Sequence, residues 1–345
     1  MVRPLHARFN AGSGSRVAAA ACVAALACSL GASSATPAPS RPAGASRQAT
    51  VTARPPAEEV AQLEGKPVDA ERLVRVWTIV YRAYDGAPRR AYVVLPRWYG
   101  PKDNPRLPLV ISPHGRGIPA KNNVKLWGDL PAIGRFAVIN PDGQGRRLAL
   151  YSWGDPEEIH DLSRMPVFLH QAMPWLRIAK DRVYAFGGSM GGQETLLLVA
   201  RYPNVIDGAA AFDSPTNMRA RYFALPGIVN GSVTQALLQA EIGGTPWQVP
   251  QAYAIRSPLD WARQIAFSRI PLQIWWSTAD RIVTNQAQES GLLYREIVSL
   301  NPAAPVRQFV GRWQHSKEMP YVLPKALQLF GLMPPFQARA PGFSV

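Results

Sequence analysis

The residues best suited to chemistry lie near the middle of the chain, in the pentapeptide GGSMG at residues 187–191. Residues 184–186 (YAF) have the character of a strand end, and residues 193–201 carry the apolar face of a helix. A sharp turn from strand to helix strains the backbone at its apex, and flanking glycines relieve the clashes. The hydroxyl of Ser189 is thereby lifted to the edge of a sheet, where the helix N-terminus faces developing negative charge. The pattern predicts that Ser189 is a nucleophile.

The motif GxSxG alone is a weak signal because glycine and serine are common, but its place between a strand and a helix makes it a strong one. The alternative is the glycine-rich turn of a nucleotide-binding fold. Here the motif comes in mid-chain rather than in a first strand–helix unit. We therefore favour a nucleophile over a phosphate-binding turn.

The elements around this turn alternate between short apolar runs and amphipathic stretches. Six runs are strand candidates, at residues 107–112, 136–140, 182–186, 208–212, 272–276 and 306–310. Helices are expected at about 157–176, 192–202, 284–300 and 317–330. A hairpin is expected ahead of them, from residues 73–80 and 90–95 around Asp85-Gly86. Near-continuous apolar strands alternating with helices indicate an open, doubly wound parallel sheet, whose functional groups gather beyond the carboxyl ends of the strands.

Further motifs follow these strands. The segments are HGRG at 114–117, PDG at 141–143, GGSMGG at 187–192 and RSPL at 256–259. Together they resemble the α/β-hydrolase superfamily, and within it the prolyl-oligopeptidase-like and secreted serine esterase branch. The resemblance spans about residues 72–330. It implies an α/β-hydrolase fold with a doubly wound, mostly parallel sheet and a cap or insertion after the strand that follows the nucleophile helix.

The resemblance also implies an acid and then a histidine, both after Ser189 along the chain. Asp280 ends the segment IWWSTAD just past a predicted strand and resembles the acid of the family. In that role its carboxylate would hold the imidazole in one tautomer. An aspartate here could instead only cap the helix expected from residue 284. Asp213, after the strand at 208–212, is the competing candidate because some hydrolases place their acid there.

One histidine suits the remaining role. His315, in GRWQHS at 311–316, follows the last predicted strand and is the only one of the five histidines after the acid. An imidazole with a near-neutral intrinsic pKa can take the serine proton and then pass it to a leaving group. The other histidines are His6, His114, His160 and His170. The expected triad is Ser189, Asp280 and His315.

An oxyanion hole needs two backbone N–H groups. The resemblance assigns one to Met190, the residue after the nucleophile, and the other to the HGRG loop. There Arg116 is the first choice and Gly115 the near alternative. The imidazole of His114 is expected to brace this loop.

The segment between about 213 and 268 lacks clear sheet character, and in this fold such an insertion usually carries the substrate wall or a lid. Tyr222 and Trp247 in this segment are therefore candidates for an aromatic substrate pocket, and so is Trp153 in the loop after Asp142. Their alternative role is to pad the insertion against the sheet. The sequence leaves both readings open.

The N-terminus has the pattern of an export signal. Arg3, Arg8 and Arg16 precede an apolar run at residues 17–30, which is too short for a comfortable membrane anchor. We expect a signal peptide at 1–35, a disordered Ala/Pro-rich linker at 36–70, a catalytic domain at 71–335 and a tail at 336–345. Both cysteines, Cys22 and Cys28, lie in the signal, so no disulfide is expected after cleavage. Lipid anchoring at Cys28 is a minor alternative.

The formal net charge of +15 falls to about +12 without the signal. The arginines are scattered and no nucleic-acid motif is present, which predicts a basic enzyme rather than a nucleic-acid-binding protein. The histidines are dispersed, so no metal and no cofactor are expected. The predicted partner is a small-molecule or polymer-borne ester, without stable membrane insertion. Oligomeric state is not indicated.

The expected function is that of a secreted serine hydrolase cleaving carboxylic esters through an acyl-enzyme. A serine exopeptidase is the alternative within the superfamily. Because true prolyl oligopeptidases carry a long β-propeller, and only about seventy residues precede the predicted domain here, esters are favoured. A non-catalytic binding module is a remote third reading, since such proteins usually lose a member of the triad. Neither the acyl nor the alcohol group is indicated.

Overall fold

The computed structural model describes residues 61–69, 72–143 and 153–335. The expected signal peptide, both cysteines, the linker up to residue 60 and the tail at 336–345 lie outside these ranges. Within them, no helix combines the length and the apolar character needed to span a bilayer.

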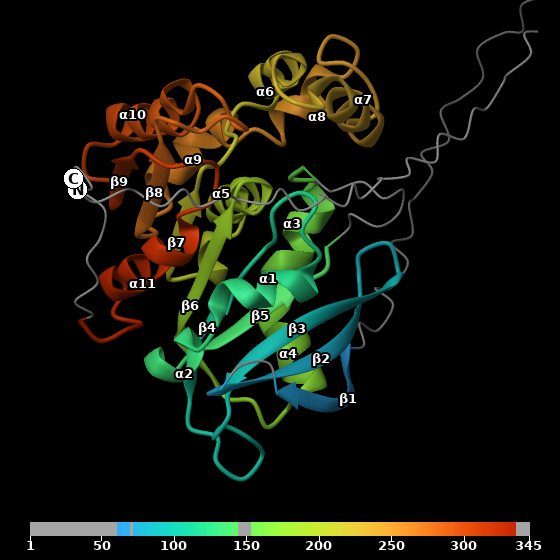
Figure 1. Ribbon diagram of the computed structural model, residues 1–345, viewed down its shortest axis with the longest axis vertical. Helices are drawn as coiled ribbons and strands as arrows, with labels where there is room; N and C mark the ends of the chain where they lie inside the picture. The colour runs from blue at the N-terminus through green and yellow to red at the C-terminus, as the bar shows by residue number, and fades with distance from the viewer. Residues whose placement is uncertain (1–60, 70–71, 144–152, 336–345) are drawn as a thin grey trace, which may run out of the picture. The chain divides into compact units, whose positions relative to one another are not determined.

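One sheet organises the described part of the chain (Figure 1). Its nine strands follow the order β1-β2-β3-β5-β4-β6-β7-β8-β9. The strands are β1 (Ala61–Asp69), β2 (Val74–Arg82), β3 (Pro88–Pro96), β4 (Leu107–Ile111), β5 (Ala137–Pro141), β6 (Ile178–Gly188), β7 (Gly208–Phe212), β8 (Leu272–Ser277) and β9 (Val306–Gly311). Pairing is antiparallel from β1 to β5 and parallel from β5 through β4 to β9.

The expected doubly wound, mostly parallel sheet is confirmed. The six apolar runs correspond to β4 through β9, and the expected hairpin corresponds to β2 and β3. Successive residues of a buried strand face opposite sides of the sheet. In β4, Leu109 and Ile111 enter one hydrophobic core and Val110 enters the other, all fully buried.

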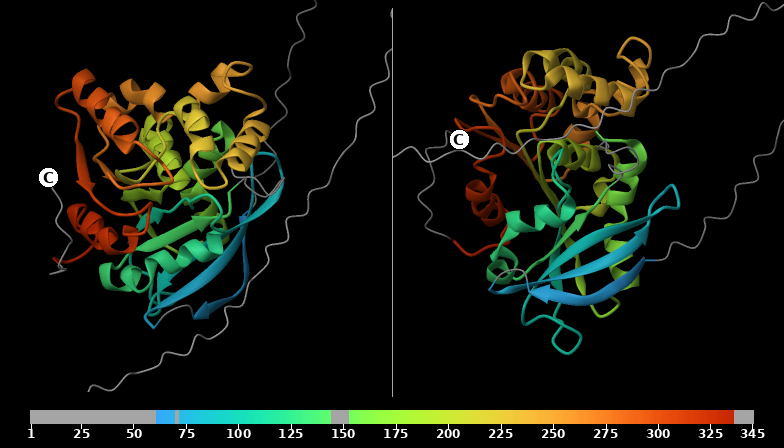
Figure 2. Two further views of the ribbon diagram at one scale, coloured as in Figure 1. Left: turned by 45° about the horizontal axis from the view of Figure 1, so that its top comes forward. Right: turned by 45° about the vertical axis from the view of Figure 1, so that its right-hand side comes forward.

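Helices cover both faces of the sheet (Figure 2). One face is covered by α3 (Pro156–Ser163), α4 (Met165–Ala172), α5 (Met190–Arg201), α9 (Ala262–Phe267) and α10 (Ser290–Leu300). The other is covered by α1 (Ala120–Trp127), α2 (Leu130–Gly134) and α11 (Met319–Leu329), with α1 and α11 in one core cluster. This arrangement leaves the carboxyl ends of the parallel strands open for loops that carry functional groups.

The linker boundary at residue 70 is wrong. Residues 61–69 form β1, which pairs antiparallel with β2 from Ala61↔Tyr81 to Asp69↔Arg75. Ala61 is buried in the core, and Glu64 forms an ion pair with Arg90 at 2.7 Å. The domain therefore begins at least ten residues earlier than expected.

Two of the helix expectations also need correction. The single helix expected at 157–176 is two helices, α3 and α4, separated at Arg164. Pro166 lies in the first turn of α4, where its missing N–H costs nothing, whereas inside one long helix it would remove a hydrogen bond. The helix expected from residue 284 begins only at Ser290, after a short 3₁₀ turn.

The insertion after β7 forms a helical cap with its own small core. It contains α6 (Met218–Ala224), α7 (Gly231–Ile242) and α8 (Pro250–Ala254), which lie beyond the carboxyl ends of the strands (Figure 1). The cap core contains Trp153, Met190, Met218, Tyr222, Leu225, Leu238, Ile242 and Tyr253. Because α9 packs against α5 and α10 on the body, the insertion ends before residue 262 rather than at 268.

Candidate active site

Ser189 occupies the turn between β6 and α5 in a strained backbone conformation. Its φ is +57° and its ψ is −125°, a combination that a non-glycine residue adopts only when the surroundings enforce it. The packing around Ser189 enforces this conformation, because neighbouring glycine positions have no room for a side chain. A Cβ at Gly187 would lie 2.2 Å from the carbonyl oxygen of Gly191, and one at Gly192 would lie 2.1 Å from Ser214 Oγ. The glycines therefore allow β6 and α5 to approach closely enough to hold this turn.

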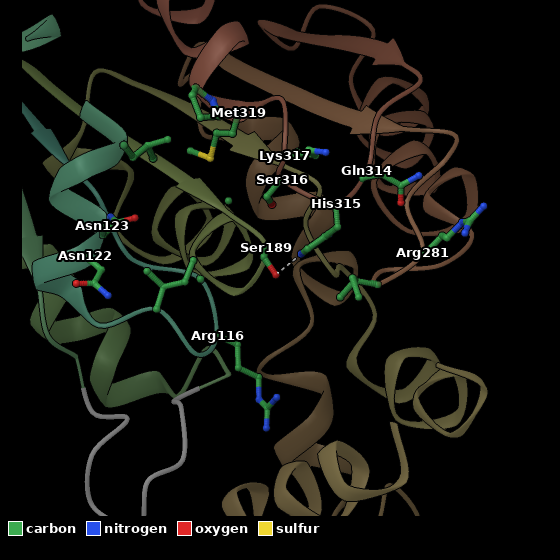
Figure 3. A pocket seen from close by; sticks show the side chains of 16 residues that line it. Arg116, Asn122, Asn123, Ser189, Arg281, Gln314, His315, Ser316, Lys317 and Met319 are labelled. Atoms are coloured by element: carbon green, nitrogen blue, oxygen red, sulfur yellow. Dashed lines mark hydrogen bonds between the residues drawn. The ribbon is translucent and has the colours of Figure 1, made fainter. Parts of the chain in front are cut away.

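The structure brings the three expected triad residues together. His315 Nε2 lies 2.8 Å from Ser189 Oγ, and His315 Nδ1 lies 2.7 Å from Asp280 Oδ2 (Figure 3). In the tautomer with the proton on Nδ1, the imidazole donates to Asp280 and accepts from the serine hydroxyl. The residues come from loops after β6, β8 and β9, at one end of the parallel part of the sheet, where only β7 lies between β6 and β8. This arrangement can draw a proton from Ser189 Oγ.

Asp280 is positioned by its own loop. Its Oδ1 accepts hydrogen bonds from the backbone N–H groups of Ile282 (2.8 Å) and Val283 (3.0 Å). Gln286 adds a side-chain hydrogen bond to Oδ2 at 3.3 Å, and the carboxylate is only 1% exposed. Asp280 thus fixes its own loop and contacts the imidazole at the same time, and it does not cap a helix, because α10 begins only at Ser290 after Glu289.

The competing acid, Asp213, has its carboxylate directed elsewhere. Oδ1 accepts from Ser277 N at 3.0 Å, and Oδ2 accepts from Trp313 Nε1 and from Ser316 N, both at 2.8 Å. Burial raises the pKa of this carboxyl to about 6, and the hydrogen bonds from Trp313 and Ser316 oppose the rise. Asp213 therefore clamps the loop that carries His315, whereas Asp280 contacts the imidazole.

These groups also form a cluster with the composition of a metal site. One ligand atom each from Asp213, Asp280 and His315 lies within 4.8 Å of the others. However, both imidazole nitrogens already have protein partners, and both carboxylates accept several N–H donors. The hydrogen bonds explain the cluster, and we assign no metal to it.

Two loops border the place where an oxyanion would form. Met190 is the first residue of α5, where backbone N–H groups have no partner within the helix. Gly115 lies against the nucleophile, since a Cβ there would be 3.7 Å from Ser189 Cβ and 3.6 Å from Gly188 O. The backbones of Met190 and of Gly115, where the two donors are expected, therefore both lie beside Ser189.

The side chains of the HGRG loop at residues 114–117 hold this loop in place. The His114 ring lies between the carbonyl oxygens of Gly115 (3.0 Å) and Asp142 (3.2 Å), a bracing position. The Arg116 side chain points away from Ser189 (Figure 3). Its guanidinium lies 3.5 Å from Thr234 Oγ1 and 5.7 Å from the centre of the Trp153 ring, so it connects the loop to the cap.

None of the three aromatic candidates is among the described residues that line the cavity at Ser189. Trp153 (3% exposed) and Tyr222 (7% exposed) belong to the cap core, where the Tyr222 hydroxyl donates to Gln239. Trp247 is 71% exposed and packs edge-on against Phe223 at 4.9 Å. Padding of the insertion, the alternative considered for these residues, is what the structure shows for Trp153 and Tyr222.

A cavity of about 580 Å³ opens beside Ser189 and His315. Sequence reasoning placed only Gly115, Arg116, Ser189 and His315 in it. The other lining side chains include Ile118, Asn122, Leu126, Arg281, Ile282, Gln314, Lys317, Met319 and Pro320. Several directly follow a motif residue in sequence, such as Arg281 after Asp280, and that adjacency was the available signal.

These features define the α/β-hydrolase fold: a doubly wound sheet, a strained serine between β6 and α5, and a histidine and an aspartate from later loops. No protein-family model matches the sequence, and no curated protein matches it. The fold is instead shared with solved structures of 12–17% sequence identity.

Three of these solved structures illustrate the range. Pyrococcus horikoshii acylaminoacyl peptidase matches at 15% identity and TM-score 0.57, over 75% of this chain and 41% of its own. An S-formylglutathione hydrolase from Agrobacterium tumefaciens matches at 12% identity and TM-score 0.57, over 78% of this chain and 98% of its own. An acetyl xylan esterase from Paenibacillus sp. R4 matches at 16% identity and TM-score 0.54, over 79% of this chain and 87% of its own. The chain spans only 35–41% of the length of three peptidases that it matches, the acylaminoacyl peptidase among them.

Proposed function

We propose that this chain is a serine hydrolase that cleaves carboxylic esters through a covalent acyl-enzyme. The observation that carries the proposal is the unbroken relay from Ser189 Oγ through His315 to Asp280, with contacts of 2.8 Å and 2.7 Å. A strained serine at a helix N-terminus, hydrogen-bonded to an imidazole, is the arrangement of an activated nucleophile. The roles of the three residues follow from this geometry.

In the first half of the reaction, Ser189 Oγ attacks the ester carbonyl carbon while His315 Nε2 takes the hydroxyl proton. The carbonyl electrons move to the oxygen, which the N–H groups of Met190 and of residues 115–116 stabilise. Asp280 stabilises the imidazolium. The carbon–alkoxy bond then breaks, His315 returns its proton to the leaving alcohol, and the acyl group remains on Ser189.

In the second half, water replaces the alcohol. His315 takes a proton from water as its oxygen attacks the acyl carbon, and the same N–H groups stabilise the second oxyanion. The bond from the carbon to Ser189 Oγ breaks and the proton returns to Oγ. The carboxylic acid leaves and the resting relay is restored.

A fluorophosphonate probe tests the proposal directly, because it reacts only with an activated serine. Wild-type protein should be labelled stoichiometrically, and Ser189→Ala should not be labelled. Absent labelling of the folded wild type would instead favour the non-catalytic binding module. A panel of p-nitrophenyl esters with aminoacyl p-nitroanilides alongside then separates ester from peptide substrates.

The serine exopeptidase is the second candidate, and one observation weighs against it. Holding a free N-terminal ammonium group in a partly buried site requires an opposite charge nearby. No Asp or Glu is among the described residues that line the cavity, and Asp280, behind the imidazole, is hydrogen-bonded to His315. We therefore expect esters to be cleaved much faster than aminoacyl anilides.

We also propose that the protein is exported from the cytoplasm by a cleaved signal peptide. The support for export is the arginine-rich start and the apolar run at residues 17–30. Expression in a bacterial host with fractionation, followed by N-terminal sequencing of the exported form, tests it. A mature N-terminus near residue 36 is expected, and full-length protein confined to the cytoplasm would contradict export.

A further inference from the structure

We infer that the cavity beside Ser189 divides the ester between two sides. The acyl group enters an apolar slot between α1 and the start of α11, and the alcohol lies on the side of His315. We call the first region the acyl slot and define it by Ile118, Asn122, Leu126, Met319 and Pro320. The inference rests on the proposed ester hydrolysis and names which part of the substrate each wall contacts.

The orientation follows from the chemistry of the tetrahedral intermediate. Its carbon carries Ser189 Oγ, the oxyanion, the alkoxy oxygen and the acyl carbon. The oxyanion must face the N–H groups of Met190 and the Gly115 loop. The alkoxy oxygen must lie within hydrogen-bond reach of His315 Nε2, which protonates it. The acyl carbon is therefore directed to the side away from His315.

Several of the side chains labelled in Figure 3 lie on one or the other of these two sides. Asn122, Asn123 and Met319 lie on one side of Ser189, and Gln314 and Arg281 lie on the other, beyond His315. The side away from His315 is thus formed by α1 and the start of α11.

The acyl slot has apolar walls close to the nucleophile. A Cβ at Gly188, the residue before Ser189, would lie 2.7 Å from Met319 Sδ. A Cβ at Gly115 would lie 3.6 Å from Ile118 Cδ1 and 3.7 Å from Ser189 Cβ. Leu126 lies one helical turn after Asn122, so both face the same side of α1. An apolar acyl chain gains free energy when these walls remove it from water.

The α1 wall is fixed before any substrate arrives. Asn123 Nδ2 donates to Asn140 Oδ1 (3.0 Å) and to Ser112 Oγ (2.9 Å), and Trp127 Nε1 donates to the same Ser112 Oγ at 3.0 Å. These buried bonds tie α1 to the ends of β4 and β5. A preformed wall loses little conformational entropy on binding and can therefore discriminate by length.

The alcohol side differs in character. Gln314 and Arg281 are exposed, and no carboxylate lies among the described cavity-lining residues. This side suits a polar leaving group and tolerates a negative charge on it. The substrate class is therefore an ester of an apolar aliphatic acid with a polar or anionic alcohol.

The test uses p-nitrophenyl esters from acetate to decanoate, which share one leaving group. Ile118→Trp and Leu126→Trp reduce the acyl slot, and Ile282→Trp is the matched control on the alcohol side. Ile118 and Ile282 are 44% and 43% exposed, so the two substitutions are equivalent in type and exposure. Thermal melts confirm that each variant is folded, and Ile118→Trp, on a loop, serves if Leu126→Trp is not.

The ratio of kcat/KM for octanoate to that for acetate should fall about tenfold or more in Ile118→Trp and Leu126→Trp, and by less than about twofold in Ile282→Trp. A fall confined to Ile282→Trp would reverse the orientation, and an unchanged ratio in all three would remove the slot. In both cases wild-type ester hydrolysis stands. If the wild type hydrolyses none of the esters, the proposed function itself is wrong.

Discussion

The indole N–H of Trp313 donates a hydrogen bond of 2.8 Å to Oδ2 of Asp213. The same oxygen accepts the backbone N–H of Ser316, so His315 lies between two residues that are both tied to one carboxylate. Ser277 adds to this clamp, because its hydroxyl accepts from Trp313 N at 2.7 Å. The loop after β9 is thus fastened to the ends of β7 and β8, which fixes the imidazole relative to Ser189.

Replacing Asp213 with asparagine should weaken catalysis without abolishing it. The amide of Asp213→Asn replaces one acceptor oxygen with an NH₂ donor. If the replaced oxygen is Oδ2, the N–H groups of Trp313 and Ser316 lose their acceptor, and if it is Oδ1, the N–H of Ser277 loses its acceptor. We expect kcat to fall about 10- to 100-fold with little change in KM, because the imidazole is displaced while the binding walls are intact. Steady-state kinetics on p-nitrophenyl butyrate measures both constants.

Asp280→Asn should be more severe, lowering kcat by about 10⁴-fold, because it removes the acceptor that selects the tautomer of His315. Asp207→Asn is the control, since Asp207 lies before β7 and accepts from Val183 N, which an amide oxygen can also do. The acid assignment is reversed if Asp280→Asn retains near wild-type activity while Asp213→Asn is inactive.

Glu241 on α7 should make stability depend on pH. Burial raises its pKa to about 9, and the nearby Glu194 contributes to the rise. A carboxyl with a higher pKa in the folded state stabilises the fold fully below pH 4.5, and the contribution is lost as pH rises through 9. Glu241→Gln removes this loss, so its Tm should exceed that of the wild type by about 3 °C or more at pH 9.

The difference should be small at pH 5, where Glu241 is protonated in the wild type. Glu296→Gln, an exposed substitution on α10, is the control and should show no pH-dependent difference. Thermal melts at pH 5, 7 and 9 measure these shifts. Equal Tm values for wild type and Glu241→Gln across the range would show that the carboxylate has a partner when ionised.

Gly187→Ala should disrupt the nucleophile turn. The new methyl group would lie 2.2 Å from the carbonyl oxygen of Gly191, and backbone cannot yield as a flexible side chain can. We expect a loss of about 3 kcal/mol or more in the free energy of unfolding, together with loss of fluorophosphonate labelling. Gly227→Ala, where no atom lies within 4 Å of the new methyl, should change neither. Chemical denaturation gives the first quantity and labelling kinetics the second.

Strand β1 should contribute to stability but not to chemistry. Deleting residues 1–60 keeps β1, whereas deleting residues 1–72 exposes the edge of β2 and the surface of α4 that β1 contacts. The longer deletion should lower Tm by about 5 °C relative to the shorter one. Activity at 25 °C should be similar in both if the protein is folded. Identical melting of the two truncated proteins would contradict the assignment of residues 61–69 to the fold.

The sequence predicted the interior of the sheet well. Strand β7 has the expected limits, 208–212, because a strand buried on both faces is a continuous apolar run. Ser189 and Asp280 could be placed because each follows such a strand, and His315 because it is the only histidine after Asp280. Strand β1 (AQLEGKPVD) escaped because an edge strand with glycine, proline and charges lacks that signal.

The features of the site that the sequence did not predict all depend on long-range packing. The three donors to Asp213 are separated from it by 64, 100 and 103 residues, so the clamp on the histidine loop has no local pattern. The surroundings of Trp153, Tyr222 and Trp247 could not be predicted because they depend on how the cap folds. Composition identifies such residues as aromatic but does not say whether they face a core, a cavity or solvent.

Met190 belongs to two structures at once. Its backbone begins α5 beside the nucleophile, and its side chain, 2% exposed, packs in the cap core with Tyr222 and Tyr253. Local opening of the cap therefore removes the packing that holds Met190, one of the two proposed oxyanion donors, in place. A covalent inhibitor on Ser189 should in turn slow amide hydrogen exchange in α6 and α8, which makes the cap a reporter of acylation as well as a cover.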